Sequence, residues 1–99
     1  MPSSHNKLKG VMQFQIAIAK LQEGQKVKLV PRANEWNEKN IDVETETGEI
    51  IGSIDKELSS KFHYFIVDKK KEYNVKVTRT YPIIGREGCS GVIIEIEDK

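Results

Sequence analysis

A change in the spacing of apolar residues near the middle of the chain constrains the fold more than any other feature. Residues 41–45 alternate between apolar and polar side chains, as expected of a strand with one buried face. Thr47 and Gly48 then provide a turn, and a second strand-like run covers residues 49–54. After Gly52 the apolar residues recur about every 3.6 positions instead of every two. The sequence therefore predicts a β-hairpin that leads directly into an α-helix.

The predicted helix extends over residues 55–67. Asp55 or Ser53 is a suitable N-cap, because a short polar side chain can accept a hydrogen bond from the first turn. Helical spacing places one set of side chains against the core and another set outward; the first set is Leu58, Phe62, Phe65 and Ile66, and the second is Ser59, Lys61 and His63. The run Asp-Lys-Lys-Lys over residues 68–71 ends the helix, and its ammonium groups are either solvated or form a rim that contacts phosphate.

The remaining apolar runs predict a mainly β fold. Alternation predicts strands over residues 12–19, 27–30, 73–81 and 92–96. The alanines in the first of these runs leave a helix over residues 13–22 as its alternative. Together with the hairpin, these runs indicate a small OB-like, partly open barrel of about six strands with one α-helix after the central hairpin. We expect residues 1–9 to be a flexible N-terminus and residues 10–99 to form a single domain.

Length and charge limit the functions open to the chain. A chain of 99 residues is long enough for one core, which buries roughly 65% of the surface of the unfolded chain. The 16 Lys and Arg residues nearly balance the 15 Asp and Glu residues, so the formal net charge is +1. Sequence-independent coating of nucleic acid needs a cation for each neutralised phosphate, which this balance does not supply. A nucleic-acid role must therefore depend on a local patch of side chains.

No segment of the sequence has the features of a membrane span or a signal peptide. The most apolar window, residues 14–19, is far shorter than the ~20 residues that a membrane helix needs. Residues 1–9 lack the apolar centre of a signal peptide. Cys89 is the single cysteine, so no internal disulfide can form, which is typical of a reducing compartment. We therefore expect a cytoplasmic protein with no membrane partner and an inert thiol at Cys89.

The sequence offers no set of residues that predicts catalysis. His5 and His63 are too few and too far apart in sequence for a metal site without help from carboxylates. The chain has no Gly-x-Ser-x-Gly elbow, no Walker loop and no Gly-x-Gly-x-x-Gly motif. We expect no zinc or other metal, no cofactor and no catalytic residue. The protein is therefore predicted not to be an enzyme.

The only tryptophan lies in a polar turn between two predicted strands. Trp36 is flanked by Asn34, Asn37 and Lys39. An indole in such a turn can stack on a base while amides and an ammonium group hold the edge of the base or its phosphate. The alternative is structural: Trp36 packs back onto the core and the asparagines close Asx turns.

The order of these motifs resembles the HIRAN domain family. The resemblance covers residues 21–58 and begins with a strand that ends in a proline-containing turn. The pattern Asn-x-aromatic-Asn-x-x-x-Ile-x-Val then covers residues 34–43, followed by a hairpin into Ile51 and Gly52 and a short helix with Lys56 and Leu58. HIRAN domains occur fused to SWI/SNF-type helicases and nucleases, and also as small stand-alone bacterial proteins. Known members have an OB-like barrel, and the best understood example grips the end of single-stranded DNA.

The resemblance implies a nucleic-acid-binding module that recognises single-stranded DNA or DNA ends, with a helicase or a nuclease as a partner protein. The implied binding residues are Trp36, Asn34, Asn37, Lys39, Ser53, Lys56 and Phe14. Where the family usually has Asn-Pro-Tyr-Asp, this chain has Asn-Glu-Trp-Asn, so a neutral amide replaces the carboxylate. Glutamines flank Phe14, with no basic residue among them. The alternative function is a protein-protein interaction module that uses exposed strand edges or the Trp36 turn.

Overall fold

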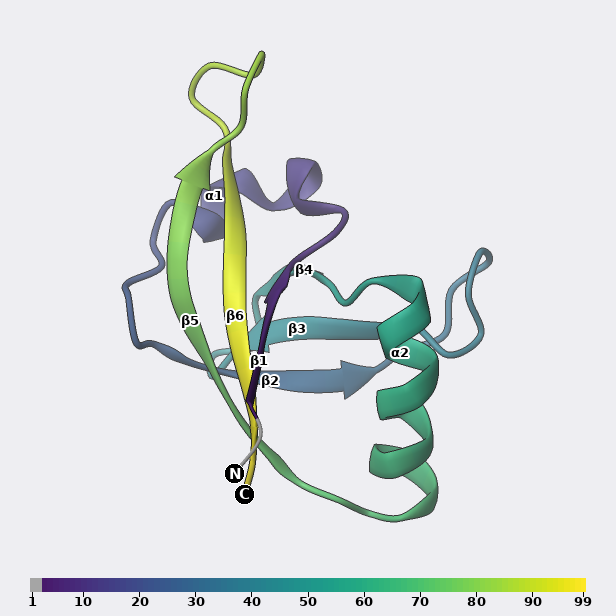
Figure 1. The fold of residues 1–99 in the computed structure, drawn as a ribbon. Coiled ribbons are helices and arrows are strands. Elements are labelled where there is room, and N and C mark those ends of the chain that lie inside the picture. Colours follow the sequence, from purple (N-terminus) through teal and green to yellow (C-terminus); the bar gives the residue numbers. More distant parts are fainter. Residues whose placement is uncertain (1–2) are drawn as a thin grey trace.

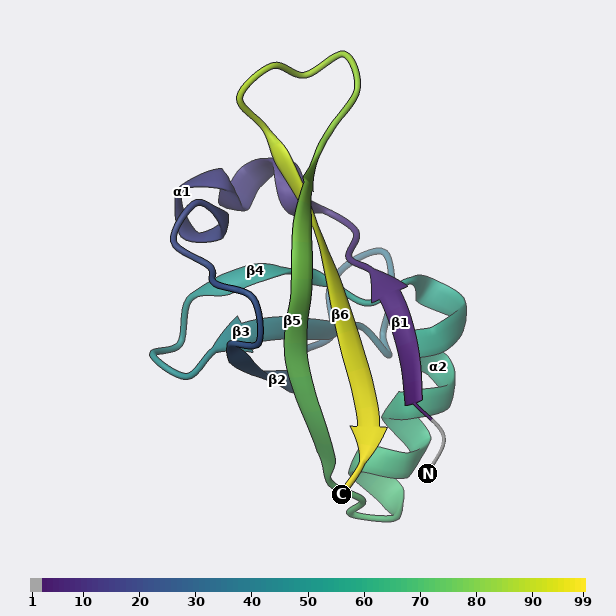
Figure 2. The ribbon, with the colours of Figure 1, turned by 60° about the vertical axis from the view of Figure 1, so that its left-hand side comes forward.

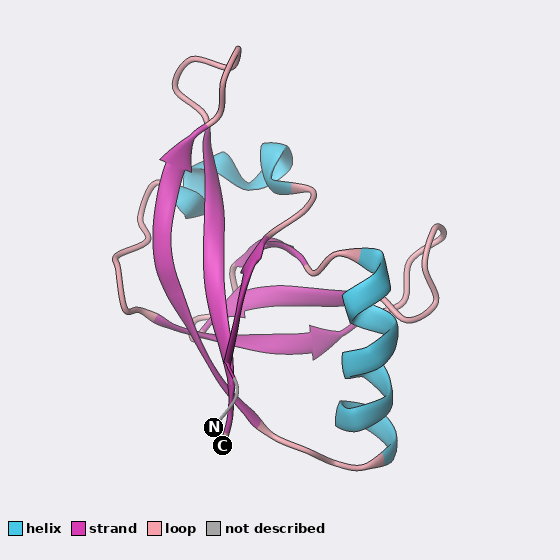
Figure 3. Cartoon of the chain, in the orientation of Figure 1, coloured by secondary structure: helices cyan, strands magenta, loops and turns pink. Residues whose placement is uncertain are grey.

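The described residues of the chain fold into one curled antiparallel sheet accompanied by two α-helices. The computed structural model describes residues 3–99. In chain order its elements are β1 (Ser3–Lys7), the 3-10 helix η1 (Val11–Phe14), α1 (Gln15–Ile18), β2 (Lys26–Pro31), β3 (Ile41–Thr45), β4 (Ile50–Ser53), α2 (Lys56–His63), the π-helical turn η2 (Tyr64–Asp68), β5 (Tyr73–Pro82) and β6 (Ser90–Asp98). Within the described residues the six strands pair in the order β1-β6-β5-β2-β3-β4. Figure 3 shows that α2 lies at one end of the sheet and α1 at the other.

The sheet forms a half-barrel because β2, β3 and β4 cross β5, β6 and β1 (Figure 1). Its two outer strands meet at one point, where Lys9, just after β1, pairs with Ser53 at the end of β4. Each residue donates its backbone N–H to the carbonyl of the other, with N···O distances of 2.8 and 2.9 Å. The predicted mainly β, partly open barrel of six strands is thus confirmed as a curled half-barrel. The structure has two helices rather than the one predicted.

Gly52 permits this close approach of the outer strands. The register of β3 and β4 shifts next to Val43, which leaves Ile51 as the extra residue of a β-bulge. Gly52 follows with φ of 154°, a conformation that residues with side chains rarely adopt. A Cβ atom at this position would lie 3.0 Å from the carbonyl oxygen of Lys9. Only glycine therefore fits at this point without a shift of the backbone.

The core is contiguous and comes mainly from the inward faces of the strands. Its members are Leu8, Val11, Ile18, Val27, Ile41, Val43, Ile51, Ile54, Phe62, Val75, Val77, Val92, Ile94 and Ile96. The alternation in β2, β3, β5 and β6 matches the strands predicted from the sequence. Each fully buried Val, Ile or Phe side chain contributes about 1.5–3 kcal/mol relative to an exposed one. This burial holds the sheet in its curled form.

The helix predicted after the hairpin is confirmed. Asp55 is its N-cap, and its carboxylate accepts a hydrogen bond from the backbone N–H of Glu57 at 3.2 Å. Phe62 is buried and its ring makes an edge-to-face contact with Tyr73 at a centroid distance of 5.1 Å. The helix continues through the π-helical turn η2, and Lys70 then adopts a φ of 55° where the chain leaves it. Figure 2 shows α2 behind β1, with its last turns extending below that strand.

The predicted orientation of Ser59 is wrong. Its side chain was expected to face outward, but the residue is 0% exposed. The hydroxyl donates to the carbonyl oxygen of Lys56 at 2.9 Å and accepts from the side-chain amide of Asn37 at 3.0 Å. Because both bonds are made inside the protein, a small polar side chain can be buried here at little cost. The buried face of α2 is therefore centred on Ser59 and Phe62.

The strand predicted over residues 12–19 is also wrong, because this segment is helical. Val11 and Ile18, two helical turns apart, are buried, whereas Ile16 is 82% exposed. The side-chain amide of Gln15 holds the segment in place: it donates to the carbonyl of Ser90 at 2.9 Å and accepts from the N–H of Ser90 at 2.7 Å. The helical alternative, which the alanines favoured, is closer to the observed structure.

Part of the N-terminal segment, for which flexibility is expected over residues 1–9, is a strand, and residues 1 and 2 lie outside the described part of the chain. Residues 3–7 form β1, which pairs with β6 from Ser3 opposite Glu97 to Lys7 opposite Ile93. Figure 2 shows β1 lying along β6 at the edge of the sheet. β1 thus replaces the incorrectly predicted strand and keeps the total at six within residues 3–99. No helix in this part of the chain combines the length and the apolar character that a membrane span requires.

Candidate nucleic-acid interface

Trp36 projects from the loop between β2 and β3, which Figure 1 shows extending away from the sheet. The residue is 78% exposed, so the alternative in which it packs onto the core is wrong. The side-chain oxygen of Asn34 accepts hydrogen bonds from the backbone N–H groups of Trp36 and Asn37, at 2.9 and 2.8 Å. Asn34 therefore closes an Asx turn, as the structural alternative predicted. The backbone of the turn is thus held in place while the ring of Trp36 stays open to solvent and available for stacking.

Asn37 joins this turn to α2. Its side-chain oxygen accepts from the backbone N–H of Lys39 at 3.0 Å, and its side-chain nitrogen donates to the hydroxyl of Ser59. Ser59 in turn donates to the carbonyl of Lys56, the first residue of α2. A chain of hydrogen bonds therefore connects the Trp36 turn with the start of the helix. The structure brings Asn34, Trp36, Asn37, Lys39 and Lys56 to the same end of the molecule.

Ser53 lies next to this group at the end of β4. It pairs with Asp42 of β3 on one side and with Lys9 on the other. Side chains of directly paired residues in antiparallel strands lie on the same face of the sheet. Lys9 is exposed, and its place beside Ser53 was not predicted from the sequence. Its segment carries no apolar alternation beyond Leu8, so the pairing partner of Lys9 could not be read from the sequence.

Phe14 does not belong to this group. It is half-buried at the end of η1 and lines a groove with Glu49 and Ile50. Ile50 begins β4 and Ser53 ends it, so Phe14 and the Trp36 turn lie toward opposite ends of this strand. The side chain also packs against the core. Its position is explained by packing.

Arg32 is close in sequence to the Trp36 turn, but its charge is already paired. Its guanidinium contacts the carboxylates of Asp42 and Glu44, which are mostly shielded from solvent. The hydrogen bonds that the guanidinium donates to Glu44 and to Asp42, the former having the larger effect, raise the pKa of Arg32 above its ordinary value. Lys39, Lys56 and Lys9 make no such pair within residues 3–99. These three ammonium groups are the cations available to an anionic ligand at this end of the molecule.

The Lys-rich loop after α2 has a structural role at its last lysine. The ammonium group of Lys71 lies 3.1 Å from Asp98 and 5.2 Å from the centre of the Tyr73 ring. The hydrogen bond with Asp98 is the main reason why the pKa of Lys71 is raised. Lys71 therefore ties the loop to β6, and the proposed rim that contacts phosphate is not formed by this residue.

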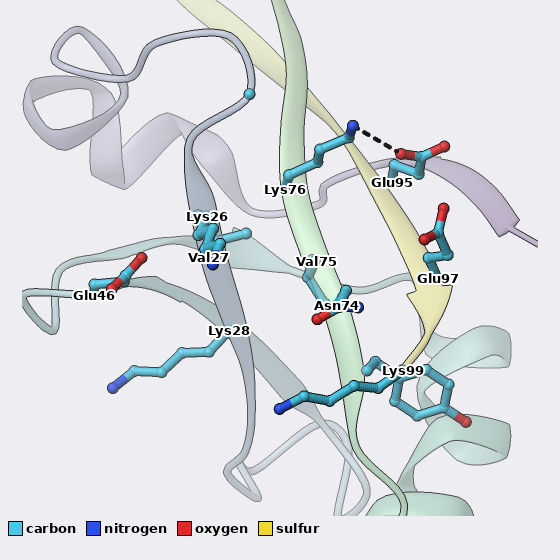
Figure 4. Close-up of a pocket in the computed structure, with 12 residues that line it drawn as sticks. Lys26, Val27, Lys28, Glu46, Asn74, Val75, Lys76, Glu95, Glu97 and Lys99 are labelled. Atoms are coloured by element: carbon cyan, nitrogen blue, oxygen red, sulfur yellow. Dashed lines mark ion pairs between the residues drawn. The ribbon is translucent and has the colours of Figure 1, made fainter.

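A separate groove of about 450 Å³ lies on the outer face between β2 and β5 (Figure 4). Charges of both signs line it: Lys26, Lys28, Lys76, Lys99, Glu46, Glu95 and Glu97. Figure 4 shows the ammonium group of Lys76 turned toward Glu95, with which it forms an ion pair at 3.5 Å. Trp36 does not line this groove. Its mixed charge gives no preference for a polyanion.

Residues 3–99 contain no group of three or more His, Cys, Asp or Glu side chains arranged to hold a metal ion. Cys89 is a free, half-buried thiol in the loop between β5 and β6.

Three kinds of group meet at the Trp36 site. The Trp36 ring can stack, the Ser53 hydroxyl can form hydrogen bonds, and the lysines at and near the start of α2 carry positive charge. These are the contacts that a single strand of nucleic acid uses.

Solved structures of other proteins are similar to this fold. The HIRAN domain of human HLTF matches with a TM-score of 0.67 and 16% sequence identity, over 98% of this chain and 76% of that chain. A protein from Lactobacillus plantarum matches with a TM-score of 0.69 and 14% identity, over 99% of this chain and all of the other. No family model matches the sequence, and no curated protein matches it significantly. The predicted resemblance to the HIRAN domain is thus confirmed at the level of the fold.

Proposed function

We propose that this protein is a nucleic-acid-binding module that takes the end of a single strand of DNA at the Trp36 turn. The observation that carries the proposal is the 78% exposure of Trp36 on a turn whose backbone is fixed by Asn34 and Asn37. An exposed indole offers a flat ring face on which a base can stack and an N–H group that can donate a hydrogen bond. The likeness of the fold to the HIRAN domain, together with the motif resemblance, supports nucleic acid as that ligand.

Each group at the site has a distinct part in this proposal. The ring of Trp36 stacks on the terminal base, which is worth about 1–3 kcal/mol and tolerates any sequence. Lys56, Lys39 and Lys9 contact phosphate oxygens, and the hydroxyl of Ser53 hydrogen-bonds to the terminal sugar or phosphate. Asn37 acts indirectly, because both ends of its side chain are used within the protein.

The proposal extends to the setting in which the module acts. It binds without catalysing a reaction, it has the OB-like closure expected of this family, and it works in the cytoplasm. A helicase or nuclease is its partner. The side-chain contacts proposed for Trp36, Ser53 and the three lysines need neither a metal nor an organic cofactor.

A titration with short single-stranded oligodeoxynucleotides tests the proposal, because the only tryptophan reports directly on the site. We expect quenching or a spectral shift of Trp36 emission at low salt, and weaker binding as salt rises. Lys56→Ala should reduce the slope of log K against log salt by about 0.7, the value for one phosphate contact with a single strand. Lys61→Ala, which removes an exposed lysine from the same helix, is the matched control. Unchanged emission at low salt with every oligonucleotide would exclude a stacking role.

A protein-interaction module is the second candidate function. Ile84 in the β5–β6 loop is completely exposed and Ile16 in α1 is 82% exposed, and these side chains offer apolar contact area to a partner chain. Binding through such residues should change little between low and moderate salt. Salt dependence therefore separates the two candidates.

A further inference from the structure

Two neighbouring rows of side chains cross the outer face of β1, β6 and β5. In the first row Glu95 of β6 lies between His5 of β1 and Lys76 of β5. One carboxylate oxygen is 3.5 Å from Nε2 of His5, and the other is 3.5 Å from the ammonium group of Lys76. The Glu95 carboxylate therefore contacts the basic side chains on both sides of it.

In the second row the central position is occupied by an aliphatic residue. Ile93 of β6 lies between Lys7 of β1 and Arg79 of β5. Both basic residues are exposed, and neither forms an ion pair with any carboxylate of residues 3–99. Two cations thus face each other across an isoleucine where the row beside them has a neutralising glutamate.

The ring of Tyr81 orients these two cations. The ammonium group of Lys7 lies 5.1 Å and the guanidinium carbon of Arg79 lies 5.9 Å from the ring centre. The ring itself is fixed across Gly91, where a Cβ atom would lie 2.3 Å from a ring carbon. Attraction to the ring holds the cations in place but leaves their N–H groups without an anionic acceptor. The missing acceptor is the observation that points to an anionic ligand.

This row is connected to the Trp36 site by β1. Lys7 and Lys9 are exposed on either side of the buried Leu8, so they point to the same face. Lys9 pairs directly with Ser53. The path from Lys7 to Ser53 is about 7 Å along the strand and about 5 Å across the pair. A line of three cations without carboxylate partners in residues 3–99, Arg79, Lys7 and Lys9, therefore leads to the start of α2.

We infer that Lys7 and Arg79, oriented by Tyr81, form a second phosphate-contact site for the same DNA strand whose end binds at the Trp36 turn. The inference rests on the proposed function, because it assigns the path of the strand beyond its terminal nucleotide. Single strands occupy about 4–16 nucleotides on an OB-type fold, which is enough to reach both places. Because Ile93 carries no charge, the side chains of Lys7 and Arg79 have no carboxylate between them and can both contact phosphate.

Binding of labelled single strands of about 3 and about 10 nucleotides, measured by anisotropy over a salt series, tests the inference. For the longer strand, the double variant Lys7→Gln with Arg79→Gln should lower the slope of log K against log salt by about 1.4, or about 0.7 for each lost contact. Ile93→Glu should lower it similarly while both cations remain, because a carboxylate there repeats the arrangement around Glu95. Lys76→Gln is the control: it removes a cation of β5 that is already paired with Glu95, and it should leave the slope unchanged.

The shorter strand separates this site from the Trp36 site. Its effect on Trp36 emission should be the same in the wild type and in the double variant. A double variant with the wild-type slope for the longer strand overturns the second site and leaves the Trp36 site standing. A wild type whose Trp36 emission does not respond overturns the Trp36 site, while the anisotropy of the longer strand still decides on Lys7 and Arg79. Thermal melting of each variant checks that these exposed substitutions leave the fold intact.

Discussion

The side-chain amide of Asn37 donates a hydrogen bond to the hydroxyl of Ser59 at 3.0 Å, and this contact joins the Trp36 turn to α2. Ser59 is fully buried and already donates to the carbonyl of Lys56. The hydroxyl has one proton, so it needs a donor as its next partner, and an amide supplies one. The carboxylate typical of the HIRAN pattern would offer only acceptors at this point. The neutral Asn37 therefore fits the buried serine on the facing helix.

Removal of this contact should loosen the turn without unfolding the protein. We expect Asn37→Ala to lower the free energy of unfolding by about 2 kcal/mol, because it removes two hydrogen bonds with a net value of about 1 kcal/mol each. Ser59 keeps its bond to Lys56, so no buried donor is left unsatisfied. Urea denaturation followed by circular dichroism measures the change. Glu38→Ala, an exposed substitution in the same turn, should stay within about 0.5 kcal/mol of the wild type.

The sequence predicts the elements whose apolar spacing is long and regular. The β3–β4 hairpin, α2, β5 and β6 all belong to this class, because their buried faces leave a period in the sequence. Residues 12–19 were misassigned because alternating and helical spacing overlap in so short a run. The polar β1 has almost no period of its own, and only its pairing with β6 makes it a strand.

The candidate site was predictable in part for the same reason. Trp36, its asparagines and Lys56 are local motifs, and the structure places them together. Lys9, Lys7 and Arg79 come from opposite ends of the chain, and only strand pairing makes them neighbours. Phe14 was assigned to the site through a strand that the structure does not contain. Local sequence motifs therefore predicted the Trp36 turn, whereas the row of cations leading away from it could be found only from the pairing of the strands.

Gly52 should be among the least replaceable residues in the chain. Gly52→Ala combines an unfavourable φ with a contact against the Lys9 carbonyl at the point where the outer strands meet. We expect a loss of about 2–4 kcal/mol in the free energy of unfolding. Gly48→Ala is the matched control, because its φ is 92° but nothing lies within 4 Å of the added Cβ. That variant should lose only about 1–2 kcal/mol, the cost of a left-handed backbone conformation in a residue that has a Cβ atom. Equal losses in the two variants would show that the Lys9–Ser53 bridge does not limit stability.

Truncation of Phe62 tests whether α2 is part of the core. The ring is 8% exposed and contacts Tyr73 edge-to-face. We expect Phe62→Ala to cost about 3–5 kcal/mol, as for other buried aromatic residues. Tyr64→Ala, in the next turn but 46% exposed, should cost far less. A loss below about 1 kcal/mol for Phe62→Ala would contradict the packing described for this helix.

Stability should fall at alkaline pH because of the contact between Lys71 and Asp98. The pKa of Lys71 is raised above its ordinary value of 10.5 by its hydrogen bond to Asp98, and burial raises the pKa of Tyr73 above 10.0. Both groups thus keep their protons in the folded state at a pH where the unfolded chain has released them. Their contribution is complete below the unfolded values and is lost as pH rises through the folded values. Melting temperatures from about pH 10 upward should fall less steeply in Asp98→Asn than in the wild type.

Replacement of Trp36 separates a binding role from a structural one. The side chain is 78% exposed, so Trp36→Ala should leave the melting temperature within about 2 °C of the wild type. Loss of one stacked base, worth about 1–3 kcal/mol, should weaken binding of a single strand by roughly tenfold or more. Trp36→Phe retains an aromatic face and should recover part of the affinity, whereas Trp36→Leu, of comparable hydrophobicity, should not. Anisotropy of a labelled oligonucleotide measures all three variants, since they lack the tryptophan signal. Equal recovery by Phe and Leu would mean that the residue contributes apolar area rather than stacking, and it would favour a protein partner at this turn.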